Sequence, residues 1–226
     1  MGQKTHPIGF RVGITRRHDS RWYADKKEMP ALIKQDHAIR KFIKQEFYGA
    51  QIPRIEIDRT RELVRILVHC AKPGVLIGRK GVKVEQLRQD LAKLVGSRIQ
   101  LDILEISKPE LEGQIVAEQI ADQLRRRMPF RRTLKKTLEL VRERGAMGVK
   151  LQISGRLGGA DIARTESLLW GQVPLSTLRA DIRYGFATAK TSYGAIGVKA
   201  WVYRGKFGEV KDGVVMRKER RNVPDA

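Results

Sequence analysis

The chain has 226 residues, which is enough for two small domains that each bury a core. Its 46 Lys and Arg residues against 25 Asp and Glu residues give a net charge of +21, which indicates a polyanionic partner, by default nucleic acid. The absence of any run of about 20 apolar residues excludes a membrane-spanning protein, and a single cysteine, Cys70, excludes an internal disulfide. We therefore expect a cytoplasmic protein with no membrane partner.

The first twenty residues are basic and contain several Pro and Gly residues, with little apolar periodicity. We interpret residues 1–20 as an extended basic arm, and a disordered terminus is the alternative. The cations that we expect to contact RNA there are Lys4, Arg11, Arg16 and Arg17.

The next segment has the order helix, strand, strand, helix, loop, helix, strand. A helical pattern begins near Pro30 and continues through Ile39 and Ile43, with Asp36 as a possible cap. Alternation predicts strands over residues 55–57, 64–68 and 99–103, and apolar spacing predicts a helix over 82–95. This order resembles that of the type II KH fold. We assign it to residues 21–107, with a core over about 39–107.

The loop between the two later helices reads Gly78-Arg79-Lys80-Gly81. Two glycines let the backbone come close to a nucleic-acid strand, and the two cations between them can meet its phosphates. The G-x-x-G spacing also occurs at Gly145, Gly155, Gly194 and Gly205, where turns between strands explain most of the matches. Only at Gly78 are both inner residues basic and both flanks helical, so we predict an RNA-binding KH loop rather than a plain helix-helix turn.

A second domain is predicted over residues 108–207. Ser107 and Glu110 form a possible capping box that begins a helix, and a second helix runs from Pro129 to Gly145. Strands are expected over 149–153, 168–170, 178–184 and 198–203, with a short helical piece over 161–166. Two helices on a mainly antiparallel sheet make the whole chain α+β. Residues 208–226 are expected to be a mobile basic tail.

The strongest cluster of charge lies on the second helix of that domain. No acidic residue occurs from Arg125 to Lys136, although like charges on neighbouring turns repel one another. A stripe of apolar residues on this helix leaves the other side to Arg132, Lys135 and Lys136, and Arg131 borders the two. We interpret the cationic side as an anion-binding face. An ordinary solvated face is the alternative.

Other side chains allow weaker interpretations. Arg156 and Arg164, next to a glycine-rich turn, are candidate phosphate clamps, and surface cations that aid solubility are the alternative. Trp170, Tyr184 and Tyr203 could stack on bases, but their strand-like surroundings favour packing. The four histidines are dispersed, and no metal-ligand spacing or phosphate loop of the nucleotide-hydrolysing type is present. We therefore expect no enzyme activity, no metal and no cofactor.

Five stretches of the sequence together are distinctive: Gly2-Gln3-Lys4 with His6-Pro7, the loop from Gly78 to Gly81, and three glycine-containing or Pro-containing segments at residues 154–164, 174–180 and 193–199. By these stretches the chain resembles the bacterial small-subunit ribosomal protein S three family. These motifs extend over about residues 2 to 203. The tail after Phe207 matches none of them.

The resemblance implies a structural constituent of the small-subunit head that binds ribosomal RNA. It implies contacts with small-subunit proteins ten and fourteen, and a place beside proteins four and five on the channel by which messenger RNA enters. The cations associated with unwinding of messenger RNA correspond to Arg131, Arg132 and Lys135, and we include Lys136 on the same helix. No homo-oligomer is expected. The alternative is a free KH protein that binds single-stranded RNA in transcription or ribosome assembly.

Overall fold

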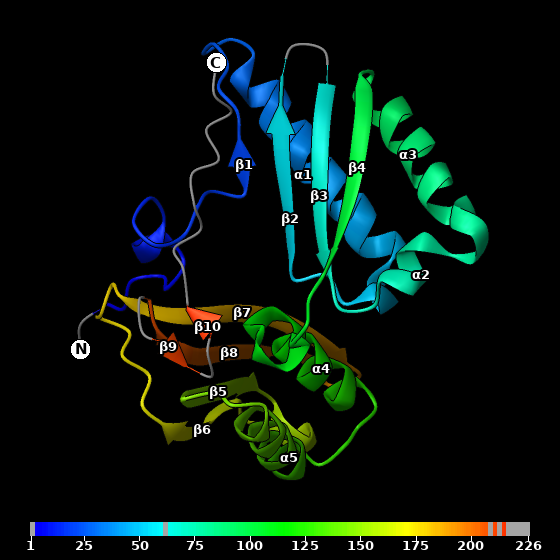
Figure 1. The fold of residues 1–226 in the computed structure, drawn as a ribbon. Coiled ribbons are helices and arrows are strands. Elements are labelled where there is room, and N and C mark those ends of the chain that lie inside the picture. The colour runs from blue at the N-terminus through cyan, green and yellow to red at the C-terminus, as the bar shows by residue number, and fades with distance from the viewer. Residues whose placement is uncertain (1–2, 61–62, 208–209, 212–213, 216–226) are drawn as a thin grey trace. The chain divides into compact units, whose positions relative to one another are not determined.

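The structure is a computed structural model that describes residues 3–60, 63–207, 210–211 and 214–215 (Figure 1). The chain divides into two units. One is formed by His18–Ser107, and the other by Met1–Arg17 together with Lys108–Ala226. Among the described residues, no helix combines the length and the apolar character needed to cross a membrane.

The unit of residues 18–107 is a four-stranded sheet with helices on one face. The strand order is β1-β2-β3-β4, in which β2 and β3 are antiparallel and the other neighbours are parallel. Figure 1 shows α1 and α3 on the same side of this sheet. The elements are β1 (Ser20–Arg21), α1 (Met29–Glu46), β2 (Arg54–Arg59), β3 (Leu63–Cys70), α2 (Pro73–Ile77), α3 (Val82–Val95) and β4 (Arg98–Glu105).

Alternation along the strands explains which face the helices cover. Ile57, Ile66 and Ile99 point to the helical side and are almost completely buried. They pack against Ile43 of α1 and Leu91 of α3, which belong to the same core. The predicted order of helices and strands is confirmed in this unit.

Asp36 corrects one detail of the prediction. It lies inside α1 rather than at its start, and it is 3% exposed. Its carboxylate accepts hydrogen bonds from Ser20 Oγ at 2.9 Å, Trp22 Nε1 at 2.9 Å and Arg59 Nε at 2.8 Å. A buried carboxylate is tolerated where such donors surround it. Asp36 therefore ties α1 to the segment before it and to β2.

The opposite face of this sheet carries ion pairs around Glu56. Its carboxylate lies 2.9 Å from His69 Nε2, 3.1 Å from an Arg21 nitrogen and 3.2 Å from Arg54 Nε. Burial alone would raise the pKa of Glu56, but the hydrogen bond to His69 and the nearby arginine charges outweigh it and lower the pKa.

We expect the stabilising effect of the Glu56 charge to disappear in acid. Because the folded pKa is lower than the ordinary value of about 4.3, its contribution is full above that value and is lost as pH falls through the folded pKa. Glu56→Gln should lower the free energy of unfolding by about 2 kcal/mol near neutral pH. Urea unfolding of both proteins at about pH 6 and about pH 3 checks this. A difference that stays constant with pH would contradict it.

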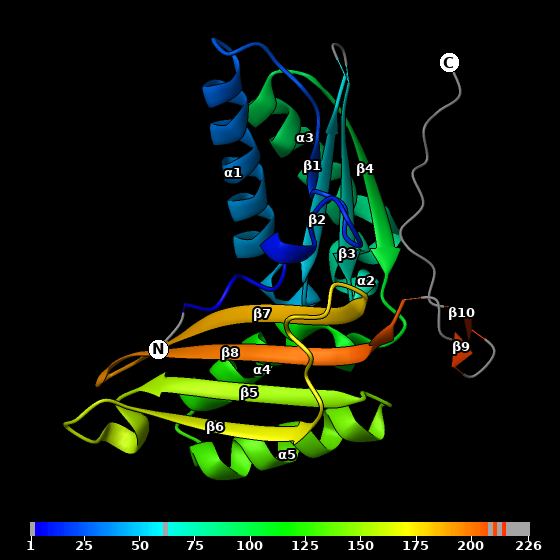
Figure 2. The same cartoon turned by 90° about the vertical axis from the view of Figure 1, so that its left-hand side faces the viewer.

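The second unit is a four-stranded antiparallel sheet of order β6-β5-β8-β7 with two helices on one face. Figure 2 shows the sheet from its other face, with α4 and α5 behind it. The elements are α4 (Gly113–Arg125), α5 (Phe130–Glu143), β5 (Gly148–Gly155), β6 (Arg164–Gly171), β7 (Ala180–Thr191) and β8 (Gly194–Lys206). The α+β fold class is confirmed.

Close backbone contact sets the position of α4 on the sheet. Gly113 begins the helix, and a Cβ placed on it would overlap the backbone of Arg183 and Tyr184 in β7. A Cβ on Gly185 would overlap the backbone of Gly113 and Gln114 in return. Only glycine permits this approach. Ile120 and Val141 of the two helices then share a core with Leu151 of the sheet.

Two local predictions, one at the boundary between the units and one in the second unit, were wrong. The expected capping box at Ser107 is absent: Lys108 precedes a 3-10 turn at Pro109–Leu111 with no side-chain cap, and α4 begins at Gly113. The expected helical piece over 161–166 is also absent, because β6 already begins at Arg164 and pairs with β5. The tail expected over 208–226 lies largely outside the described residues, apart from the antiparallel pair β9 (Val210–Lys211) and β10 (Val214–Val215).

The first residues of the chain do not form the expected extended arm. Gly9–Arg11 is a 3-10 turn, and Arg11 is 3% exposed. Its guanidinium donates to the carbonyls of Pro7, Leu175, Thr177 and Ala180 at 2.9 to 3.0 Å. Burial lowers the pKa of Arg11, and the charge of Asp181 opposes that shift. Arg11 thus fastens the first residues to the loop before β7.

Candidate RNA-binding surfaces

The predicted loop lies between α2 and α3. Gly78 has φ 68° and Gly81 has φ 77°, a region that glycine enters at little cost. A Cβ on Gly78 would lie 2.8 Å from Cγ of Lys83, whereas Gly81 has open space on that side. Arg79 is exposed, and the side chain of Lys80 lies outside the described part of the structure. The loop therefore presents uncovered backbone at Gly81 next to the exposed cation of Arg79, as contact with a phosphate chain requires.

A groove that the sequence did not reveal lies between α3 and β4. It encloses about 570 Å³ and is lined by side chains of both elements and by Leu63 at the start of β3. Val84 of α3 and Leu101 of β4 give it apolar walls. Its charged lining includes Arg88, which lies 3.5 Å from the carboxylate of Glu85 in the same groove. It begins one turn after Gly81, so a strand held at the loop could continue into it.

The α5 cationic face consists of Arg131, Arg132, Lys135 and Lys136. All four side chains are exposed, and none forms an ion pair with a carboxylate among the described residues. They stand on successive turns at the positive end of the helix, and its first turn contains no acidic residue. Both the repulsion between turns and the helix dipole disfavour this arrangement in the free protein. An anion bound to the face would offset both.

Arg164 joins this face from the sheet. Its guanidinium carbon lies 5.7 Å from the centre of the Phe130 ring, and that of Arg131 lies at the same distance. The structure thus brings two arginines from β6 and α5 to one aromatic ring. Arg164 also lies 3.7 Å from Glu166, which compensates part of its charge.

Arg156 has a different setting from the one predicted. It follows β5 and precedes a three-residue 3-10 turn, Leu157–Gly159, so no helix N-terminus stands beside it. Its guanidinium donates to Ala160 O at 2.9 Å, Tyr193 O at 3.2 Å and Asp161 Oδ1 at 2.9 Å. These bonds hold two loops together, and they leave Arg156 less free to clamp a phosphate.

The residues expected along the arm are not equivalent. Lys4 is exposed, whereas Arg16 and Arg17 are half-buried and already engaged with neighbouring groups. Arg11 is withdrawn from the surface, so its assignment as an RNA contact is wrong. A basic residue in a Pro-rich and Gly-rich segment looks like an RNA ligand in sequence, and only the distant carbonyls show otherwise.

The described residues contain no group of three or more His, Cys, Asp or Glu side chains placed to hold a metal ion. What the structure offers is a glycine loop between two helices on a KH-type sheet and a helix face of uncompensated cations. This combination defines a KH-domain RNA-binding protein.

Comparison with known proteins gives the family. The KH domain family matches residues 38–111, and the family described as ribosomal protein S3, C-terminal domain, matches residues 120–202. The small ribosomal subunit protein uS3 of Caldicellulosiruptor bescii is 54% identical over 91% of this chain and 93% of its own. The uS3 proteins of Syntrophomonas wolfei and Nitratidesulfovibrio vulgaris are each 52% identical over 92% of this chain, and over 91% and 97% of their own lengths. The chain belongs to the uS3 family, which is structural and non-enzymatic.

Proposed function

We propose that the chain is a structural constituent of the small ribosomal subunit. In this role it binds ribosomal RNA, and the α5 cationic face borders the path of messenger RNA. The observation that carries the proposal is the α5 cationic face itself. Its exposed cations repel one another and are repelled by the positive end of the helix dipole. Membership of the uS3 family supports the ribosomal setting. The protein would accordingly be ribosome-associated in the cytoplasm.

The partners follow from the same family relationship. We infer contacts with small-subunit proteins ten and fourteen, and a position near proteins four and five at the messenger channel. The candidate contacts to ribosomal RNA are the exposed or half-buried cations Lys4, Arg16, Arg17 and Arg164. Arg156 also remains a candidate, although its hydrogen bonds hold two loops together. The loop Gly78 to Gly81 adds a second RNA contact in the KH unit.

The α5 cationic face would act on RNA through charge alone. Cations on a fixed helix attract phosphates of any sequence, and they favour separated strands where the channel is too narrow for a duplex. The face needs no nucleotide hydrolysis of its own, because the movement of the ribosome along the messenger supplies the energy. It would hold melted strands apart while the ribosome advances.

Reversing the charges of Arg131, Arg132 and Lys135 to Glu should slow translation through messenger hairpins. Unstructured messengers should pass at the ordinary rate, because they require no melting. In RNA binding by the purified chain, the loss of three phosphate contacts should make the slope of log affinity against log salt shallower by about 2. Ribosomes carrying the variant, timed on messengers with and without a hairpin, check the first result, and salt titration checks the second.

A matched control is the reversal of Lys34, Lys41 and Lys44, which are exposed on α1 and carry the same total charge. If this control slows translation through hairpins to the same extent, the net charge of the protein rather than the α5 cationic face is responsible. Equal hairpin passage by wild type and the α5 variant would refute the messenger role. Salt-resistant residence of the chain in small-subunit particles distinguishes the ribosomal role from that of a free KH protein.

A further inference from the structure

Helix α4 ends in a conformation that is unusual for the residue found there. Met128 N donates to Gln123 O at 3.1 Å and Arg127 N donates to Leu124 O at 3.0 Å, the hydrogen-bond pair that closes many helices. That closure requires a left-handed residue, and Arg127 has φ 58°. Glycine is the common choice at this position, because side chains are disfavoured there.

Helix α5 provides an internal comparison. Ala146 N donates to Val141 O at 3.3 Å and Gly145 N donates to Arg142 O at 3.0 Å, which is the same closure with glycine in the left-handed position. The chain therefore uses glycine at one of these two helix ends and arginine at the other. Residues held in disfavoured conformations concentrate at functional sites, so the side chain of Arg127 calls for a role.

Arg127 stands at the mouth of a pocket in the unit that contains α4. The pocket encloses about 280 Å³ and is formed by three connections: α4 to α5, β5 to β6, and the β7 to β8 turn. Its base is apolar, with Leu124, Leu157 and Ile196 nearly buried. None of the thirteen residues that line it is acidic. The volume is just below the usual range of about 300 to 1,000 Å³ for ligand sites, which suits a single ring system.

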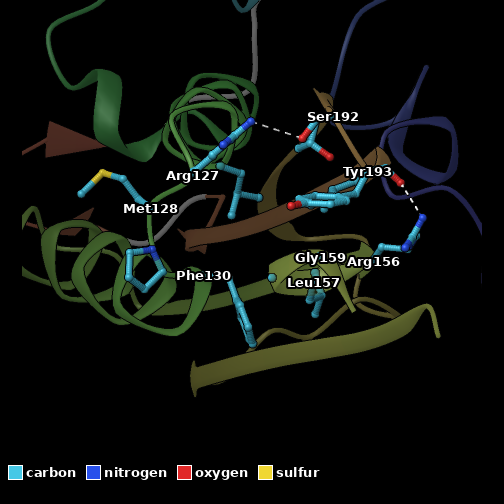
Figure 3. A pocket seen from close by; sticks show the side chains of 13 residues that line it. Arg127, Met128, Phe130, Arg156, Leu157, Gly159, Ser192 and Tyr193 are labelled. Carbon is cyan, nitrogen blue, oxygen red and sulfur yellow. Dashed lines mark hydrogen bonds between the residues drawn. The ribbon is translucent and has the colours of Figure 1, made fainter. Parts of the chain in front are cut away.

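Tyr193 presents an aromatic face within this pocket. Its side chain is 53% exposed although one side of the ring rests on Gly159, where a Cβ would lie 3.1 Å from the ring. Figure 3 shows Arg127 and Arg156 on either side of Tyr193. Arg156 holds the turn by its bond to Tyr193 O, and its guanidinium carbon lies 5.9 Å from the centre of the Tyr193 ring. Together with Gly159 on one side of the ring, this contact limits the positions that the ring can take before any ligand binds.

Arg127 is the available cation of the pair. Its hydrogen bond to Ser192 Oγ is long, at 3.4 Å, whereas Arg156 already has three acceptors. We propose that the pocket takes one unpaired RNA nucleotide, with its base against Tyr193 and its phosphate on Arg127. The inference rests on the RNA-binding function proposed above and adds a base-holding site apart from the α5 cationic face. An apolar side chain from a partner protein could fill the apolar floor of the pocket, but it would leave Arg127 without an anion.

The first test compares two single-stranded RNA oligonucleotides of equal length, one intact and one in which every nucleotide is abasic. Binding to the purified full-length chain is measured by fluorescence anisotropy at fixed salt. Tyr193→Leu should weaken binding of the intact oligonucleotide by about tenfold and leave that of the abasic one unchanged, because only bases stack on the ring. Equal effects on both oligonucleotides, or on neither, would overturn the proposal.

Arg127→Gly separates binding from folding. Glycine suits the left-handed position, so the variant should melt at the wild-type temperature or above it. It should nevertheless bind both oligonucleotides several-fold more weakly, with a salt slope shallower by about 0.7. Lys199→Ala, which removes one exposed charge from β8, is the matched control and should retain most of the affinity. Unchanged RNA affinity in Arg127→Gly would overturn the assignment of Arg127.

These outcomes remain distinct from those of the proposed function. Reversal of the charges on the α5 cationic face should weaken the binding of the intact and the abasic oligonucleotide by the same factor. A wild-type chain that binds neither oligonucleotide would contradict both proposals. In assembled small subunits, a photoreactive phenylalanine at position 193 identifies the source of the nucleotide. Two outcomes support the site: crosslinks to ribosomal RNA in subunits that lack messenger, and crosslinks to messenger that form only when the ribosomes are programmed with it. Crosslinks to protein alone would overturn it.

Discussion

Replacing Gly185 with alanine is expected to lower the free energy of unfolding of the unit containing α4 by more than about 3 kcal/mol. The added Cβ would overlap backbone atoms of Gly113 and Gln114, which cannot rotate away as a flexible side chain would. Relief requires α4 to move off β7, and the core beneath it would then open.

Urea unfolding of the full chain, followed by tryptophan fluorescence, measures this effect, because Trp170 and Trp201 both lie in that unit. Gly74→Ala is the matched control. Its site in α2 has open space around the new methyl group, so the variant should be as stable as wild type or slightly more stable. An unfolding midpoint for Gly185→Ala equal to that of wild type would show that α4 can shift without loss.

Replacing Arg11 with methionine is expected to destabilise the same unit by at least about 3 kcal/mol. The guanidinium serves the carbonyls of Pro7, Leu175, Thr177 and Ala180, and methionine would leave these acceptors without their donor. Arg11→Lys should rescue little, because one ammonium group cannot span acceptors that a planar guanidinium reaches in several directions.

Thermal unfolding and limited proteolysis near the N-terminus measure the result. Lys4→Met is the control, since Lys4 is exposed and should tolerate the change within about 0.5 kcal/mol. If Arg11→Lys proved as stable as wild type, the multiple hydrogen bonds of Arg11 would not be the source of the stability.

The sequence predicted well the features that depend on local periodicity. Alternation at Ile55 and Ile57 and helical spacing at Leu87 and Leu91 correspond to buried faces in β2 and α3. The order of elements in the KH unit follows from these patterns, because each face needs a partner. The cationic side of α5 was predicted for the same reason: its buried stripe of Leu134 and Val141 fixes which residues face outward.

Features that depend on distant parts of the chain were missed or misread. Asp36 resembles a helix cap, but its donors come from β2 and from residues before α1. Ser107 has the spacing of a capping box, yet a 3-10 turn intervenes before α4. The pocket at Tyr193 joins three connections that are far apart in sequence. One signal for this pocket was present in the sequence. Arg127 follows α4 at a position where glycine is common, and α5 does have a glycine, Gly145, at the equivalent position.

The anchoring of Arg11 has a consequence for synthesis of the chain. Arg11 and Ala180 are 169 residues apart, and the residues between them include the whole of His18–Ser107. At about 5 to 20 residues per second, the carbonyl of Ala180 is made about 10 to 30 seconds after Arg11. During that interval the KH unit can fold, but the carbonyls near Ala180 that accept hydrogen bonds from Arg11, in the basic N-terminal segment, have not yet been made. RNA captured by this nascent segment would have to release Arg11 before the second unit could close.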